Sequence, residues 1–207
     1  MTAFEELERE YDQYYTDDPE KWSHAGHDAE VFKIVQPYGP PRSLIDIGCG
    51  NGHTLAHFRA NWPEVEYAGL DPSGVALELA RRKLPGTLFF HGTVEKCQMT
   101  GFEMALVVGV AEHFADVVTG LIGVRKWLKP GGIAYVEVPN CIAYPTSEQV
   151  EGFRRLNQGS RQKEWHLYRE TWEELIQISG LVIRESVVGS SVYNEFIWIL
   201  ERRKTED

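Results

Sequence analysis

The sequence predicts an α/β protein with a mostly parallel sheet, helices on both faces and an antiparallel hairpin at the end. Short apolar runs alternate with helical patterns over about residues 42–140, at the close spacing typical of strand–helix–strand units. The last third departs from this alternation, because two strand-like runs, 181–188 and 192–201, are separated only by Gly189-Ser-Ser191. A parallel sheet finished by a hairpin is seldom seen in ordinary nucleotide-binding folds.

Residues 1–41 are predicted to form an N-terminal helical cap. One helical pattern runs from Phe4 to Tyr15, a second covers about residues 28–36, and Gly39-Pro-Pro41 marks the boundary to the main domain. The cap contains the aromatic residues Tyr11, Tyr14, Tyr15 and Trp22. They either dock the helices onto the core or line a ligand pocket that the cap closes.

The main domain is predicted to span residues 42–207. Its expected strands are 44–47, 65–70, 87–90, 102–108 and 133–138, and its expected helices are 53–61, 73–84, 114–128 and 171–179. Ligands of such sheets bind outside the carboxyl ends of the strands. Residues from about 144 to 168 do not resemble a core crossover, and we expect them to form an insertion that acts as a substrate lid.

A glycine turn after the first strand is the strongest local signal for a ligand. The run Leu44–Ile47 is typical of a strand buried on both faces, and Gly48, Gly50 and Gly52 follow it before a helical pattern. Such a turn is expected to place backbone N–H groups around a ligand, which approaches without meeting a Cβ. The spacing differs from the dinucleotide fingerprint, which needs a glycine at His53. A purely structural turn remains the alternative.

Asp71 is the second signal, because it ends the second strand 23 residues after Gly48. A carboxylate at this place accepts hydrogen bonds from both hydroxyls of a ribose. The alternative is an acid that favours the start of the next helix through the helix dipole. Since Ser73 can cap that helix, we expect Asp71 to be free for a ligand.

Composition narrows the classes of protein. The length of 207 residues with 43% hydrophobic residues fits one domain with a sizeable core. Three scattered cysteines, Cys49, Cys97 and Cys141, fit neither a disulfide framework nor a zinc site, so a cytoplasmic location is expected. No secretory signal or membrane span is expected. The net charge of −10 disfavours nucleic-acid binding, which needs clustered basic residues.

Several motifs in a fixed order resemble those of class I S-adenosylmethionine-dependent methyltransferases. They are Leu44-Ile-Asp-Ile-Gly-Cys-Gly-Asn-Gly52, Gly69-Leu-Asp-Pro-Ser73, Val108-Gly-Val-Ala-Glu-His113, Leu128-Lys-Pro-Gly-Gly132 and the terminal hairpin. Each motif is weak alone, but the ordered set over about residues 42–202 is specific. The similarity is greatest to the small-molecule branch that modifies ubiquinones and polyketides. The resemblance implies a Rossmann-like seven-stranded sheet with its last strand inserted antiparallel, and S-adenosyl-L-methionine as the cofactor.

The resemblance also implies which residues hold this cofactor. Asp46, Gly48, Cys49 and Gly50 are expected at the methionyl and sulfonium end, and Asp71 at the ribose. Pro72, Thr93 and Val94 are expected beside the adenine, and Gly109 and Val110 at the strand end beside the reactive methyl. The family often has an aspartate at the place of Thr93, where it bonds the adenine amine. Here the Thr93 hydroxyl or a backbone carbonyl would have to replace that contact.

Methyl transfer needs an aligned nucleophile and, for oxygen or nitrogen acceptors, a base that takes a proton. The candidate bases are His166 and His113, and the cap residues His24 and His27 are further candidates for ligand contact. The other histidines are expected to be structural or exposed: His53, His57 and His91. No histidines and carboxylates have a metal-site spacing, so no metal is expected.

A basic stretch lies in and just after the predicted lid: Arg154, Arg155, Arg161, Lys163 and Arg169. It is either a solvated loop or a site for a carboxylate or phosphate of the acceptor. The sequence therefore predicts methyl transfer to a small molecule, most readily at oxygen, by a monomer or homodimer. The rivals are a methyltransferase for tRNA or protein, a nucleotide-cofactor oxidoreductase, and a non-catalytic S-adenosylmethionine-binding regulator.

Overall fold

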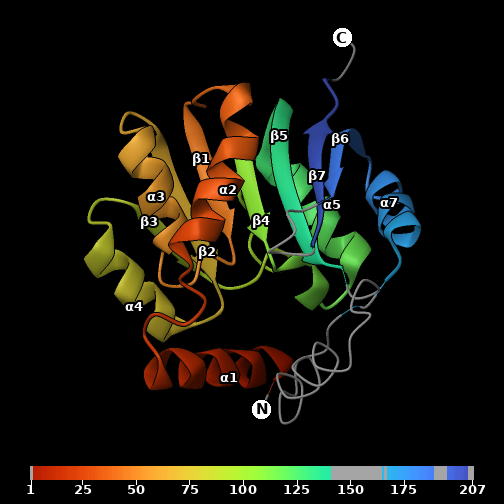
Figure 1. Cartoon of the computed structure of the whole chain (residues 1–207). Coiled ribbons are helices and arrows are strands. Elements are labelled where there is room, and N and C mark those ends of the chain that lie inside the picture. Colours follow the sequence, from red (N-terminus) through yellow and green to blue (C-terminus); the bar gives the residue numbers. More distant parts are fainter. Residues whose placement is uncertain (1, 141–164, 166, 189–194, 205–207) are drawn as a thin grey trace, which may run out of the picture.

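A seven-stranded sheet with the order β3-β2-β1-β4-β5-β7-β6 forms the centre of the molecule (Figure 1). The computed structural model describes residues 2–140, 165, 167–188 and 195–204. The strands are β1 (Ser43–Ile47), β2 (Glu66–Asp71), β3 (Leu88–His91), β4 (Phe102–Val108), β5 (Leu128–Pro139), β6 (Leu181–Val188) and β7 (Glu195–Arg202). The helices are α1 (Ala3–Asp17), α2 (Ala25–Val35), α3 (His53–Asn61), α4 (Gly74–Lys83), α5 (Val117–Trp127) and α7 (Arg169–Ile178), with short 3-10 turns at Gln36–Tyr38 and Ala111–His113.

The sheet is parallel from β3 to β5, whereas β7 runs antiparallel to both of its neighbours. The strands β6 and β7 pair from Leu181↔Arg202 to Val188↔Phe196, as a hairpin requires. The predicted fold class is therefore confirmed, including the antiparallel terminal hairpin.

Helices cover both faces of the sheet and bury two hydrophobic clusters. On one face, α5 and α7 bury Trp127 and Trp172 against the strands, together with Trp198 of β7. On the other face, α2 and α3 supply Phe32 and Phe58, whose rings meet edge to face with centroids 5.1 Å apart. The apolar stripes of the helices thus fix which face each helix covers.

Three element boundaries differ from the sequence prediction. Helix α5 begins at Val117 rather than near Phe114, because the Asp116 side chain caps it by accepting from the Thr119 N–H. Helix α2 begins at Ala25, so His27 lies in its first turn and not in a loop. Strand β5 begins at Leu128 and includes the Lys-Pro-Gly-Gly segment that was expected to precede it.

Helix α1 runs crosswise along the end of the sheet rather than against either face (Figure 1). Its Asp12 carboxylate accepts from the Ser73 hydroxyl at 2.6 Å and from the Val75 N–H at 3.0 Å, at the start of α4. Because α4 begins directly after β2, these bonds hold α1 at the carboxyl edge of the sheet.

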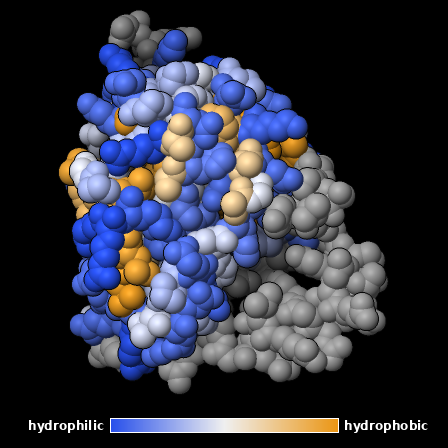
Figure 2. Space-filling view, turned by 60° about the vertical axis from the view of Figure 1, so that its left-hand side comes forward, coloured by the Kyte–Doolittle hydropathy of each residue, from blue (hydrophilic) through white to orange (hydrophobic). Residues whose placement is uncertain are grey.

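The surface described by the structure is mainly hydrophilic on the face shown in Figure 2, where apolar groups form small separate patches. Among the described residues, no helix combines the length and the apolar character needed to cross a bilayer.

Candidate functional site

The glycine turn and Asp71 meet at the carboxyl ends of β1 and β2. The Gly50 N–H donates to Asp71 Oδ2 at 2.8 Å, and the Ser73 N–H donates to Asp71 Oδ1 at 2.8 Å. The Ser73 hydroxyl caps α4 by accepting from the Ala76 N–H, as predicted. Asp71 is thus held by two backbone donors and is not free as expected, although a carboxylate keeps further lone pairs for a ligand.

The backbone amides of the turn are used inside the protein. The Gly48 and Cys49 N–H groups both donate to the Leu70 carbonyl, at 2.7 and 3.0 Å, because the β1–β2 ladder continues past the end of β1. This differs from the expected cradle of amides that point at a ligand. What the turn offers instead is the absence of side chains at positive φ, with Gly48 at 79° and Gly50 at 52°.

Close approach at the two glycines brings other elements to this edge. A Cβ on Gly48 would lie 2.3 Å from Val110 Cγ2, and a Cβ on Gly50 would lie 2.1 Å from the Tyr15 hydroxyl. Larger residues would therefore push away both the end of β4 and helix α1. The structure thus brings together the predicted site residues Gly48 and Val110, and adds Tyr15 to them.

Asp46 is a buried carboxyl group in the same region, with 3% of its surface exposed. Burial, and then the nearby charges of Asp28 and Asp71, raise the pKa of Asp46 to about 8. Within the described part of the chain, no group donates a hydrogen bond to its side chain. A buried carboxylate without donors is costly, and a positively charged ligand would remove that cost.

The pKa of Asp71 is raised less, to about 6. Burial raises it, whereas the bonds from the Ser73 and Gly50 N–H groups favour the ionised form and lower it. At neutral pH, Asp71 is therefore mostly ionised, and it is suited to accept hydrogen bonds from hydroxyl groups.

The remaining predicted cofactor residues lie around this edge with different side-chain environments. The Gly92 N–H donates to the Asp71 carbonyl at 3.0 Å, which places Thr93 next to the end of β2, and the Pro72 carbonyl lies 2.8 Å from His91 Nε2. The side chains of Cys49 and Val94 pack into the two hydrophobic clusters instead. Gly109 follows β4 with φ 60°, and its N–H donates to the Glu137 carbonyl.

Helix α1 closes this edge with aromatic residues. Tyr15 is 5% exposed, and burial together with the Asp71 charge raises the pKa of its hydroxyl well above the usual range. The rings of Tyr11, Tyr14 and Tyr15 all pack around Trp22. The aromatic group therefore docks the helix onto this edge, with the Tyr15 hydroxyl beside Gly50 of the glycine turn.

Of the two candidate bases, His113 lies in the short turn after β4. Its Nε2 is 3.9 Å from Glu112 Oε1, and the Glu112 carbonyl accepts from the Trp165 N–H at 2.8 Å. His166 lies outside the described residues, as do residues 144–164 of the predicted lid and four residues of the basic stretch: Arg154, Arg155, Arg161 and Lys163. The fifth, Arg169, pairs with Glu173 and contacts the Ser186 hydroxyl.

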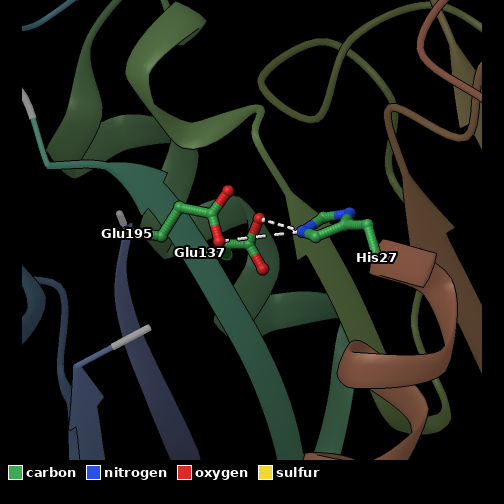
Figure 3. A group of neighbouring side chains, drawn as sticks. All are labelled: His27, Glu137 and Glu195. Carbon is green, nitrogen blue, oxygen red and sulfur yellow. Dashed lines mark hydrogen bonds and ion pairs between the residues drawn. The ribbon is translucent and has the colours of Figure 1, made fainter. Parts of the chain in front are cut away.

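A second polar cluster lies further along the edge, between α2, β5 and β7 (Figure 3). His27 Nε2 is 2.8 Å from Glu137 Oε1 and 3.7 Å from Glu195 Oε2. Burial lowers the pKa of His27, but the two carboxylates outweigh it and raise that pKa to about 10. Sequence reasoning missed this cluster, because 110 residues separate His27 from Glu137 and no local spacing connects them.

Comparison with known proteins gives consistent matches. Residues 45–134 match the family model of a methyltransferase domain. Trans-aconitate 2-methyltransferase of Methylobacterium radiotolerans is 35% identical over 123 residues, which are 57% of this chain and 45% of that protein. The enzyme of the same name from Acidovorax is 28% identical over 52% of this chain and 42% of its own length. The chain thus spans less than half the length of these curated relatives.

Solved structures share the fold at low sequence identity. Mitomycin 7-O-methyltransferase superposes with a TM-score of 0.77 at 19% identity, covering 97% of this chain and 61% of that one. Magnesium protoporphyrin IX methyltransferase from Synechocystis, solved with bound SAH, has a TM-score of 0.71 at 12% identity and covers 97% of this chain and 100% of that one. The ordered motifs, the strand order and these matches support a class I S-adenosylmethionine-dependent methyltransferase, with the methyltransferase domain matched over residues 45–134.

Proposed function

We propose that this protein transfers a methyl group from S-adenosyl-L-methionine to a small-molecule acceptor, with oxygen as the acceptor atom. The names of its relatives support this proposal, since trans-aconitate 2-methyltransferase and mitomycin 7-O-methyltransferase act on small molecules. The chain covers only part of the curated relatives, so the acceptor is proposed by chemical class and not taken from them.

One observation carries the proposal, which is the buried Asp46 carboxyl without a hydrogen-bond donor among the described residues. S-adenosyl-L-methionine has an ammonium and a sulfonium group, either of which supplies the positive charge that this carboxylate needs. Asp71 lies on the neighbouring strand and keeps lone pairs for the two ribose hydroxyls. Asp46 therefore fits the methionyl part of the molecule, and Asp71 fits its adenosyl part.

When bound, S-adenosyl-L-methionine supplies a methyl group that its sulfonium already activates. The residues of this chain have to orient the acceptor, exclude water and take a proton from it. We assign the exclusion of water to the cap of residues 1–41, with Tyr15 over the glycine turn, and to the lid of about residues 144–168. His113 at the end of β4 and His166 in the lid are the proposed bases.

The test is isothermal titration calorimetry of the full chain with S-adenosyl-L-methionine and with its demethylated product. We expect one saturable site for both and no saturable heat with a nicotinamide dinucleotide. Folded protein that gives no heat with either methionine compound would contradict the proposal. Transfer of a labelled methyl group to small hydroxy and carboxylic acids then separates an enzyme from a regulator that only binds.

A further inference from the structure

We propose that His27, Glu137 and Glu195 form a binding site for a divalent transition-metal ion. This site is distinct from the residues proposed to hold S-adenosyl-L-methionine, and the inference does not depend on methyl transfer. Its ligands would be one imidazole nitrogen and two carboxylates, contributed by α2, β5 and β7 (Figure 3).

The three donor atoms already converge. His27 Nε2, one oxygen of Glu137 and one oxygen of Glu195 all lie within 4.8 Å of one another. Ligands at the usual metal distances of about 2.0–2.2 Å are separated from each other by about 3 Å. The distance of 2.8 Å from His27 Nε2 to Glu137 Oε1 already meets this value, and the 3.7 Å to Glu195 Oε2 needs only a small side-chain rotation.

Backbone structure fixes the two carboxylates relative to one another. Strands β5 and β7 pair with Glu137 opposite Ile197 and Pro139 opposite Glu195. Glu195 is two residues from Ile197, so both glutamates lie on the same face of the sheet as diagonal neighbours. Two like charges are thus held close, with 4% of the buried Glu137 side chain and 19% of the partly buried Glu195 side chain exposed. A cation between them removes the repulsion.

The surroundings also orient the ligands. The Tyr135 hydroxyl donates to Glu137 Oε2, and therefore turns the other carboxylate oxygen towards His27. Hydrogen bonds of this kind are the usual support of metal-binding carboxylates. The His27 imidazole is 15% exposed and is carried by the first turn of α2, which packs on this face of the sheet.

The donor set selects the class of metal. Mg²⁺ and Ca²⁺ take oxygen ligands, whereas an imidazole with two carboxylates suits Zn²⁺, Mn²⁺, Fe²⁺ or Co²⁺. The competing interpretation is a structural ion triad, in which protonated His27 alone balances the two glutamates. Another buried histidine–acid pair, His53 Nδ1 with Asp28 Oδ2 at 2.9 Å, has a threonine rather than a second carboxylate beside it, and it provides a matched control.

The experiment is equilibrium dialysis of the metal-stripped full chain against Zn²⁺ and Mn²⁺, with bound metal counted by mass spectrometry. We expect one ion per chain in the wild type. Binding should weaken about 100-fold in His27→Gln and in Glu195→Gln, and about 10-fold in Tyr135→Phe, which removes only the orienting bond. His53→Gln should bind as the wild type does, and excess Mg²⁺ should not compete.

Two results of the dialysis would overturn the proposal. One is wild-type protein that retains less than about a tenth of an equivalent of either metal, as the ion-triad interpretation requires. The other is binding that persists in both His27→Gln and Glu195→Gln. Because a variant can fail to fold, the wild type is also examined with Mn²⁺ by pulsed electron paramagnetic resonance. Bound Mn²⁺ without coupling to a histidine nitrogen would equally reject the site.

Discussion

The carboxyl edge of the sheet has two halves, one at β1 and β2 and one at β5 and β7. The buried acids in these two halves have different hydrogen-bond partners. At β1 and β2, Asp71 accepts two backbone N–H bonds, whereas Asp46 has no donor within the described residues. At β5 and β7, the Glu137 carboxylate accepts a hydrogen bond from the Tyr135 hydroxyl, and its other oxygen lies 2.8 Å from His27 Nε2. Without a ligand, the second half is thus partly balanced by protein side chains, whereas Asp46 in the first half has no such partner among the described residues.

This difference between Asp46 and Glu137 indicates which half of the edge gains free energy when a cationic ligand binds. A buried carboxyl without a partner costs several kcal/mol or keeps its proton, and its raised pKa shows the second outcome. A cationic ligand that reaches Asp46 recovers this cost. The β1–β2 half therefore trades stability of the free protein for affinity, whereas in the β5–β7 half the His27 and Tyr135 side chains already offset part of that cost.

The largest expected effect is on Asp71. Replacing Asp71 by Ala should weaken S-adenosyl-L-methionine binding by about 100-fold, because two hydrogen bonds to a charged group are lost at about 1.5 kcal/mol or more each. Calorimetry measures the loss, and circular dichroism checks that the variant folds. Glu103→Gln is the control, since Glu103 pairs with Arg42 at the opposite edge. Equal affinity in Asp71→Ala and the control would refute the ribose contact.

A smaller effect, with opposite signs for binding and stability, is expected at Asp46. Asp46→Asn should weaken cofactor binding about 10-fold, because the amide cannot balance a positive charge. The same change should leave the free energy of unfolding of the unliganded protein unchanged or raise it by about 1 kcal/mol at pH 8, since no described hydrogen bond is lost. Calorimetric titration with S-adenosyl-L-methionine tests the loss of affinity, and urea unfolding tests the change in stability. A variant that loses stability and keeps its affinity would show that Asp46 is structural.

The sequence predicted which motifs meet in the β1–β2 half, because the residues of each motif are contiguous. The glycine turn and Asp71 each follow a strand, and parallel strands bring their ends together. It did not predict that Leu70 would accept the amides of Gly48 and Cys49, since that bond depends on the exact end of the strand ladder. Tyr15 was named with two open functions, and only the packing of α1 shows how near it lies to Gly50.

The β5–β7 half could not be predicted from local patterns. Glu137 lies inside an apolar strand and Glu195 begins another, and neither has a neighbour in sequence that indicates a polar cluster. His27 was named as a candidate for ligand contact that precedes the second cap helix, and its position follows from where α2 begins. Long-range pairing of this kind is encoded in strand register, which the sequence pattern alone does not give.

The pH dependence of stability sharpens the same contrast. The pKa of Asp46 is about 8 in the folded protein and about 4 when unfolded. Its contribution to stability is therefore fully present below about pH 4 and is lost as the pH rises towards 8. Without cofactor, the wild type should lose about 2.5 kcal/mol of stability relative to Asp46→Asn between pH 5.5 and 7.5. Urea unfolding of both proteins at each pH measures this, and a constant difference would contradict the raised pKa.

The smallest effect concerns α1, which covers only the β1–β2 half. Asp12→Ala removes the bonds to the Ser73 hydroxyl and the Val75 N–H, and should lower the free energy of unfolding by about 1 kcal/mol. Hydrogen exchange should become faster in Ala3–Asp17 and stay unchanged in β5, because α1 can detach while the sheet remains folded. Cofactor affinity should fall by about threefold, since the detached helix takes Tyr15 away from the glycine turn. Asp17→Ala is the control on the same helix, where the side chain accepts a bond from Gln13 and from no other described residue. If Asp12→Ala sped exchange in β5 as much as in α1, the helix would be part of the core and could not act as a cover for one half of the edge.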